Sequence, residues 1–157
     1  MQKKELTSTS LYYGKVNMPK GFEINSKPLI MGTFEQEYLN KKFPFSRDLD
    51  KVDTYIRDYA IAKHKLSLEG IETWGSFYLP LQSSKIMKHK YNFTVLYGTE
   101  IHKDSCEVTI FVNENKEHVV KLSTNDFIMF PSNKSYYVNS NESHKINFIQ
   151  SMLYELK

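Results

Sequence analysis

The spacing of the apolar residues in this chain changes near residue 70. From residue 46 to residue 66 they recur at steps of three and four, which is the spacing of one face of an α-helix. From Ile71 onward the pattern has a period of two, in short runs rich in Tyr, Phe, Val, Ile and Thr. Alternation with this composition is typical of β-strands. The pattern therefore predicts helices in the first half of the chain and β-structure in the second.

Two helices are expected between residues 26 and 66. Ser26 precedes Lys27 and Pro28, which resembles an N-cap followed by proline in the first turn, and this helix would run to Asn40. Ser46 would cap the second helix. The second helix carries an apolar stripe opposite polar positions, and its main members are Leu49, Val52, Ile56 and Ala60. Such a stripe must pack on another element, so we expect it to be buried against a sheet.

Seven short strands are expected after the helices. They cover residues 74–79, 94–97, 106–112, 118–122, 127–130, 135–138 and 145–154, and polar turn residues separate them. The connections are too short for the crossover helices of a parallel sheet. The predicted fold is therefore α+β and mainly β: an antiparallel jelly roll or double-stranded β-helix, with one or two N-terminal helices backing a sheet.

Length and composition indicate how many domains the chain forms and in which compartment it is expected. The chain has 157 residues, of which 40% are apolar and 25% charged, and it shows no repeat or linker. We expect a single domain over residues 1–157, made of an N-terminal arm (1–25), a helical segment (26–66) and the jelly roll (71–156). The sequence has no hydrophobic signal segment, and no apolar stretch approaches the roughly 20 residues of a membrane-spanning helix. With one cysteine, Cys106, it is expected in the reducing cytoplasm of the producing cell, with no membrane partner.

The charge pattern gives little support for nucleic-acid binding. The net charge is +3, and the basic residues are spread along the chain. The densest basic stretch, residues 85–90, includes His89 and could contact phosphate, but we interpret it as a solvated loop. The chain contains only two arginines, Arg47 and Arg57, and many Asn, Tyr, Phe and Ile residues, which is typical of an AT-rich genome such as that of a phage or a marine bacterium.

One pair of residues could carry chemistry. His102 and Asp104 stand one residue apart just before the strand that begins at Cys106, and period-two spacing would place both on the inward face with Cys106. An inward His and carboxylate could supply two ligands of the two-His-one-carboxylate triad that holds non-haem Fe(II). The alternative is a hydrogen-bonded histidine at the rim of a barrel, with Asp104 serving the turn.

The motif order over the last sixty residues extends this idea. Gly98 to His102-x-Asp104 is followed by a β run, by Phe-Pro-Ser at residues 130–132 and by Lys145-Ile146-Asn147. This order resembles the core of the Fe(II)/2-oxoglutarate oxygenases. In that family a distal iron-binding His lies four residues after Phe-Pro-Ser, and an Arg-x-Ser motif follows whose Arg binds oxoglutarate. The resemblance assigns the distal metal position to Tyr136 and the oxoglutarate positions to Lys145 and Asn147.

The chain departs from the family pattern at these positions. Tyr136 supplies a phenol, with a pKa of about 10, where the family has an imidazole. Lys145 keeps the charge of the Arg but loses its planar fork. His144 could replace the distal ligand, yet it neighbours Lys145 and would face the opposite side of a regular strand. We therefore expect no cofactor; the alternative is a site that holds Fe(II) and 2-oxoglutarate.

These observations favour a non-catalytic jelly-roll protein used for binding or assembly, and specifically a small structural protein of a phage particle. The alternative is an active non-haem Fe(II)/2-oxoglutarate dioxygenase, and a sugar- or small-molecule-binding cupin-like module is a third possibility. The polar N-terminal residues up to Tyr13 have little reason to be ordered alone, so we expect a partner to order them. The expected partners are other proteins or further copies of this chain, located in the cytoplasm or in a phage particle.

Overall fold

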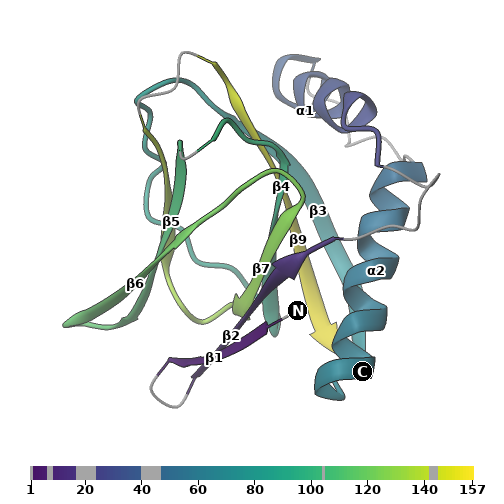
Figure 1. The fold of residues 1–157 in the computed structure, drawn as a ribbon, viewed down its shortest axis with the longest axis vertical. Helices are drawn as coiled ribbons and strands as arrows, with labels where there is room; N and C mark the ends of the chain where they lie inside the picture. Colours follow the sequence, from purple (N-terminus) through teal and green to yellow (C-terminus); the bar gives the residue numbers. More distant parts are fainter. Residues whose placement is uncertain (1, 7–8, 17–23, 40–46, 104, 142–144) are drawn as a thin grey trace.

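The fold consists of two helices followed by most of the strands, after a short N-terminal hairpin (Figure 1). The computed structural model describes residues 2–6, 9–16, 24–39, 47–103, 105–141 and 145–157. In chain order its elements are β1 (Gln2–Leu6), β2 (Thr9–Lys15), α1 (Lys27–Leu39), α2 (Arg47–His64), β3 (Leu68–Tyr78), β4 (Phe93–Glu100), β5 (Cys106–Asn113), β6 (Lys116–Lys121), β7 (Asp126–Pro131), β8 (Tyr136–Ser140) and β9 (Asn147–Leu156).

The strands form two antiparallel sheets. The larger sheet has the order β1-β2-β7-β4-β9-β3, and the smaller has the order β6-β5-β8. Isolated bridges from Ser83 to Asn139 and from Met87 to Tyr136 place residues 83–87 along the free side of β8. Figure 1 shows both helices on the side of the larger sheet that faces away from β5 and β6. This arrangement confirms the predicted antiparallel jelly roll backed by helices.

The larger sheet carries a separate apolar cluster on each of its faces. Between the sheets, Cys106, Val108 and Ile110 are fully buried, as their inward spacing predicted. On the helix side, Val52, Ile56 and Ala60 of α2 are fully buried against strand residues, and Leu49 is partly buried. The predicted stripe therefore packs on the sheet, and each large aliphatic side chain there contributes about 1.5–3 kcal/mol of transfer free energy.

Within the N-terminal arm, β1 and β2 are ordered by pairing inside the chain, which corrects the expectation that a partner must order them. β2 pairs antiparallel with β7, with Tyr12 opposite Met129, and β1 pairs with β2. Leu11 and Tyr12 are buried, at 0% and 6% exposure. A partner was expected because the sequence of the arm is polar, but β7 offers a free edge whose backbone groups β2 satisfies.

The first strand after the helices is longer than predicted. β3 begins at Leu68 instead of residue 74, and it pairs with β9 along its whole length. The register shifts between Gly70 and Glu72, where Ile71 forms a bulge.

In the described part of the chain, no helix combines the length and the apolar character needed to cross a membrane.

Candidate functional site

His102 does not continue the strand from which its direction was inferred. The Ser105 N–H donates to the His102 carbonyl oxygen at 3.0 Å, and the Ser105 hydroxyl donates to the same oxygen at 2.6 Å. These bonds from Ser105 close a turn at His102, and β5 begins only at Cys106. Because side chains alternate only within a strand, the inward direction predicted for His102 has no basis. Asp104 lies outside the described residues.

Asn147, predicted to face oxoglutarate, instead ties this turn to two strands. Its side chain is fully buried, and its Oδ1 accepts the His102 N–H at 2.9 Å. Its Nδ2 donates to the hydroxyls of Ser105 and Ser140, both at 2.9 Å. Both ends of the amide are thus used inside the protein, which is a structural role. Lys145 is exposed two residues before β9.

The structure does not bring His102 and Tyr136 together. Tyr136 is the first residue of β8, and Ser140, which shares Asn147 with the His102 turn, is the last. Four residue steps along a strand correspond to about 13 Å. The two described members of the predicted ligand set, His102 and Tyr136, are therefore tied to opposite ends of β8, and the full set with Asp104 stays a prediction. His144 lies outside the described residues.

The side chain that meets Tyr136 is His89. The His89 Nε2 and the Tyr136 hydroxyl form a hydrogen bond of 2.7 Å. The His89 ring also packs edge-on against Trp74, with centroids 5.1 Å apart, and the Tyr136 ring packs against Phe130 at 5.2 Å. Reciprocal backbone bonds of 2.8 and 2.9 Å between Met87 and Tyr136 hold the His89 segment beside β8.

Both partners of this hydrogen bond are held in their neutral forms. Burial raises the pKa of the Tyr136 phenol well above its ordinary value of 10.0, and the nearby Tyr78 raises it further. Burial lowers the pKa of His89 below 6.5, and the charge of Glu72 opposes this shift. Near neutral pH the contact is therefore a hydrogen bond between a phenol and an uncharged imidazole.

These residues do not fit an iron triad. In a facial triad both histidines bind one ion, so the residues at their positions must meet. The residue that meets Tyr136 is His89, and the residue two positions further, where a His-x-Asp motif has its carboxylate, is Tyr91. These positions hold one imidazole and two phenols. Among the described residues, no three His, Cys, Asp or Glu side chains lie close enough to hold a metal ion.

Sequence reasoning missed His89 because it was assigned to a basic loop. The one available signal was that His89 lies four residues before the apolar strand β4. A His-x-Asp motif would have a carboxylate two residues after the histidine, but this chain has Tyr91 there. Its contact with Tyr136 spans 47 positions of sequence. A pairing over that distance is set by the sheet topology, which local patterns do not contain.

His89 lies in the wall of a cavity that we call the barrel-mouth pocket. The pocket has a volume of about 440 Å³, and its lining consists of Glu72, Trp74, Lys88, His89, Lys90, Tyr91 and Leu153. Trp74 alternates with Ser76 and Tyr78 on β3, and Tyr78 belongs to the cluster between the sheets. The pocket therefore opens from the interior side of the larger sheet, near the Tyr136 end of β8.

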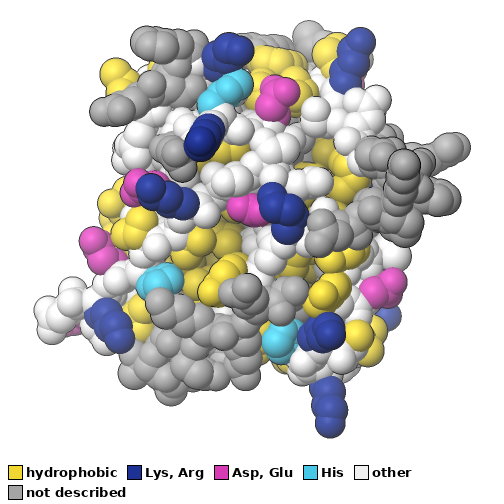
Figure 2. Space-filling model, in the orientation of Figure 1, with side chains coloured by type: hydrophobic (Ala, Val, Ile, Leu, Met, Phe, Trp, Pro, Cys, Tyr) yellow, Lys and Arg dark blue, Asp and Glu magenta, His cyan; other side chains and the backbone are white. Residues whose placement is uncertain are grey.

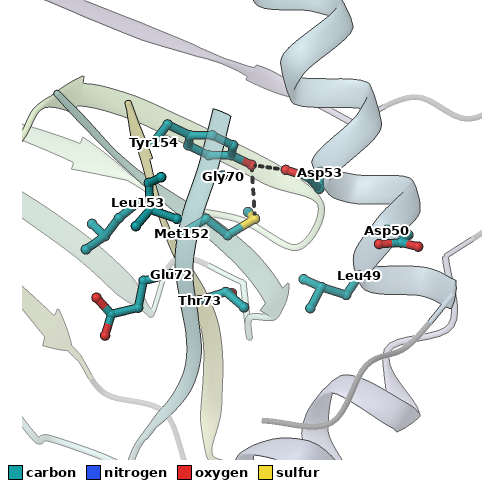
Figure 3. Close-up of a pocket in the computed structure, with 10 residues that line it drawn as sticks. Leu49, Asp50, Asp53, Gly70, Glu72, Thr73, Met152, Leu153 and Tyr154 are labelled. Atoms are coloured by element: carbon teal, nitrogen blue, oxygen red, sulfur yellow. Dashed lines mark hydrogen bonds between the residues drawn. The ribbon is translucent and has the colours of Figure 1, made fainter. Parts of the chain in front are cut away.

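A second cavity, of about 220 Å³, lies on the other side of β3, between the start of α2 and the bulge. Here the Tyr154 hydroxyl donates to the Asp53 carboxylate at 2.6 Å, as Figure 3 shows, and Arg57 pairs with the other carboxylate oxygen at 3.0 Å. Burial and the Asp53 charge raise the pKa of Tyr154. Asp53 is thus used in a tether between α2 and β9. In the same view Glu72 projects away from α2.

The surface shows no concentrated basic face in the view of Figure 2. Lys and Arg side chains there are scattered among hydrophobic, acidic and uncharged groups. Dispersed charges of both signs lack the focused positive field by which proteins hold a nucleic-acid backbone. The expectation that nucleic acid is not a partner stays a prediction from the sequence.

Comparison with known proteins identifies the fold. No protein-family model and no curated protein sequence matches the chain. Among solved structures, a Pseudomonas putida prolyl-4-hydroxylase matches with a TM-score of 0.66 and 9% identity, covering 96% of this chain and 90% of the hydroxylase. The non-haem α-ketoglutarate-dependent carbocyclase SnoK from nogalamycin biosynthesis matches with a TM-score of 0.68 and 8% identity over 94% and 79% of the two chains. A prolyl hydroxylase from Trichoplax adhaerens matches with a TM-score of 0.61 and 10% identity, covering 92% of this chain and 83% of the hydroxylase.

Identities this low establish the architecture and not the activity. The structural matches to the Pseudomonas putida hydroxylase and to SnoK cover 96% and 94% of this chain, so the similarity extends over nearly the whole fold. The chain therefore has the double-stranded β-helix fold of the Fe(II)/2-oxoglutarate oxygenases, as its motif order indicated.

Proposed function

We propose that this chain is a non-catalytic jelly-roll protein that works by binding, on a scaffold of the oxygenase type. The observation that carries the proposal is the 2.7 Å hydrogen bond between His89 and Tyr136. It occupies Nε2 of His89, one of the two imidazole nitrogens through which a histidine can bind a metal ion. It also brings to that nitrogen a phenol that burial keeps protonated, and a protonated phenol is a poor ligand for Fe(II).

An active Fe(II)/2-oxoglutarate dioxygenase is the second candidate. What favours it is the likeness in fold to several such enzymes, together with the charge of Glu72 acting on His89. In that case His89 and Glu72 would be two of the ligands. Asp104 and His144, which lie outside the described residues, would be the first to test as the third.

Metal and product analysis separates the two candidates. The purified protein is incubated without oxygen with Fe(II) and 2-oxoglutarate and then exposed to air. We expect no stoichiometric iron and no succinate, because three protein ligands are needed to hold the ion with positions open for substrates. Succinate formation that is lost in His89→Ala would establish the dioxygenase. Formation lost in His102→Ala but retained in His89→Ala would establish the ligand set first predicted from the sequence.

The more specific role in assembly rests on sequence alone. Nothing in the matched structures supports a component of a phage particle, and pairing with β7 already accounts for the order of β2. Association with other proteins or with further copies of the chain stays a prediction. Native mass spectrometry of the purified protein tests self-association directly, and a monomer at micromolar concentration would contradict it.

A further inference from the structure

We propose that the barrel-mouth pocket binds a small organic anion that carries a flat ring. This inference rests on the proposed function, because it assigns a ligand class to the cavity where the oxygenase-like scaffold lacks a fitting metal triad. A cavity of about 440 Å³ lies within the range of about 300–1,000 Å³ that is usual for small-ligand sites. The aromatic and basic residues of its lining indicate which class of ligand it binds.

The ring is inferred from the aromatic part of the lining. Trp74 is half-buried in the wall, and Tyr91 is 41% exposed although it is a large aromatic residue. His89 fixes the position of Trp74 through their edge-on contact at 5.1 Å. Rigid aromatic side chains offer contact area to a flat ring at small cost in conformational entropy.

The negative charge is inferred from the basic side chains. Lys88 and Lys90 lie on either side of His89 in the sequence, and both line the pocket. Glu72 is the one acidic side chain of the lining, so the lining carries two positive charges and one negative charge. A cleft with an excess of one charge attracts ligands of the opposite charge. Glu72 can accept a hydrogen bond from an N–H or O–H group of the ligand.

The backbone at Tyr91 is a second and independent indication. Tyr91 has φ of 73°, in the left-handed region that a bulky residue rarely adopts. Such conformations cost of order 1–3 kcal/mol and are concentrated at binding and catalytic sites. The segment that carries Lys88 and Lys90 is meanwhile anchored by the backbone bonds of Met87 and the side-chain bond of His89 to Tyr136. The backbone that carries the two lysines is thus anchored beside β8 before any ligand binds.

Trp74 gives the experiment its signal, because it is the only tryptophan of the chain. Its emission is followed during titration with adenosine 5′-monophosphate and with benzoate, both of which are anions with a flat ring. Adenosine is the ring without the charge, and 2-oxoglutarate is a charge without the ring. Free N-acetyltryptophanamide, titrated in parallel, corrects for absorption by the probes. We expect a saturable change with at least one ring-bearing anion, and affinity at least about tenfold weaker for both comparison probes.

Charge variants test the assignment to this pocket. Lys88→Gln combined with Lys90→Gln should weaken binding about fivefold to tenfold, whereas Lys116→Gln, at an exposed position at the start of β6, should leave it unchanged. Circular dichroism confirms that the variants fold. Absence of a saturable change with both ring-bearing anions up to 10 mM, or equal affinity for 2-oxoglutarate, would overturn the ligand class. Neither result would produce succinate in the iron assay, so this failure is distinguishable from failure of the proposed function.

Discussion

Replacing Tyr136 with Phe removes one hydroxyl group from the centre of the candidate site. The ring stays, so its packing against Phe130 is retained, and only the hydrogen bond to His89 is lost. A hydrogen bond between neutral groups contributes about 0.5–1.5 kcal/mol net. His89 is only half-buried and borders an open pocket, so water can reach its freed nitrogen. We therefore expect a loss of about 1 kcal/mol in the free energy of unfolding, which corresponds to about 2–4 °C in Tm.

The measurement is equilibrium unfolding in urea, followed by the emission of Trp74, which lies against His89. Tyr137→Phe is the matched control, because Tyr137 is the next residue of β8, faces the opposite side and is only half-buried. Loss of the Tyr137 hydroxyl should change the free energy of unfolding by less than about 0.5 kcal/mol. An equal effect of the two substitutions would refute the reasoning, because it would mean that the Tyr136 hydroxyl gains nothing from His89.

Two further predictions concern stability. Gly98→Ala should destabilise the protein by about 1–3 kcal/mol in urea unfolding, because the added Cβ would overlap the backbone carbonyl of Ser123. Gly70→Ala is its control, since there the nearest atom, of Asp53, is 3.6 Å away, and equal stability of the two variants would contradict the prediction. Burial raises the pKa of Tyr78 from 10.0 to about 12, so the unfolded chain loses this proton before the folded protein does. Stability should therefore fall between pH 10 and 12 by about 2–3 kcal/mol from this group, and a Tyr78→Phe variant with an unchanged alkaline slope would contradict this.

The sequence was informative where a local pattern carries the structure. The stripe of α2 and the alternation in β5 each point to one buried face, and both faces are buried as predicted. The first part of β3 was missed because residues 69–72 are all exposed and include Gly70, so no apolar alternation marks them. β1 and β2 were missed for a related reason: their order depends on the edge of β7, which is more than 100 positions away in the chain.

The candidate site was harder to predict, because it depends on contacts between distant segments. His102 was assigned by extending the alternation of β5 backwards, but the turn closed by Ser105 interrupts the strand. His89 lies in a segment that joins the smaller sheet only through isolated bridges, so its local sequence shows no strand pattern. Only the topology, which places residues 83–87 beside β8, brings His89 to Tyr136.

Different residues stabilise the fold and line the pocket, so the fold can be the same as in the oxygenases while the site is different. The apolar clusters that hold the sheets and helices together contain neither Trp74 nor His89, and the two lysines of the barrel-mouth pocket are exposed. Substitutions of the two lysines therefore cost the fold little, whereas large-to-small substitutions in the clusters leave cavities that cost about 2–5 kcal/mol each. Selection for folding preserves the clusters and leaves the pocket open to change. A likeness in fold at 8–10% identity is thus compatible with a different ligand, and the chemistry must be argued from the pocket itself.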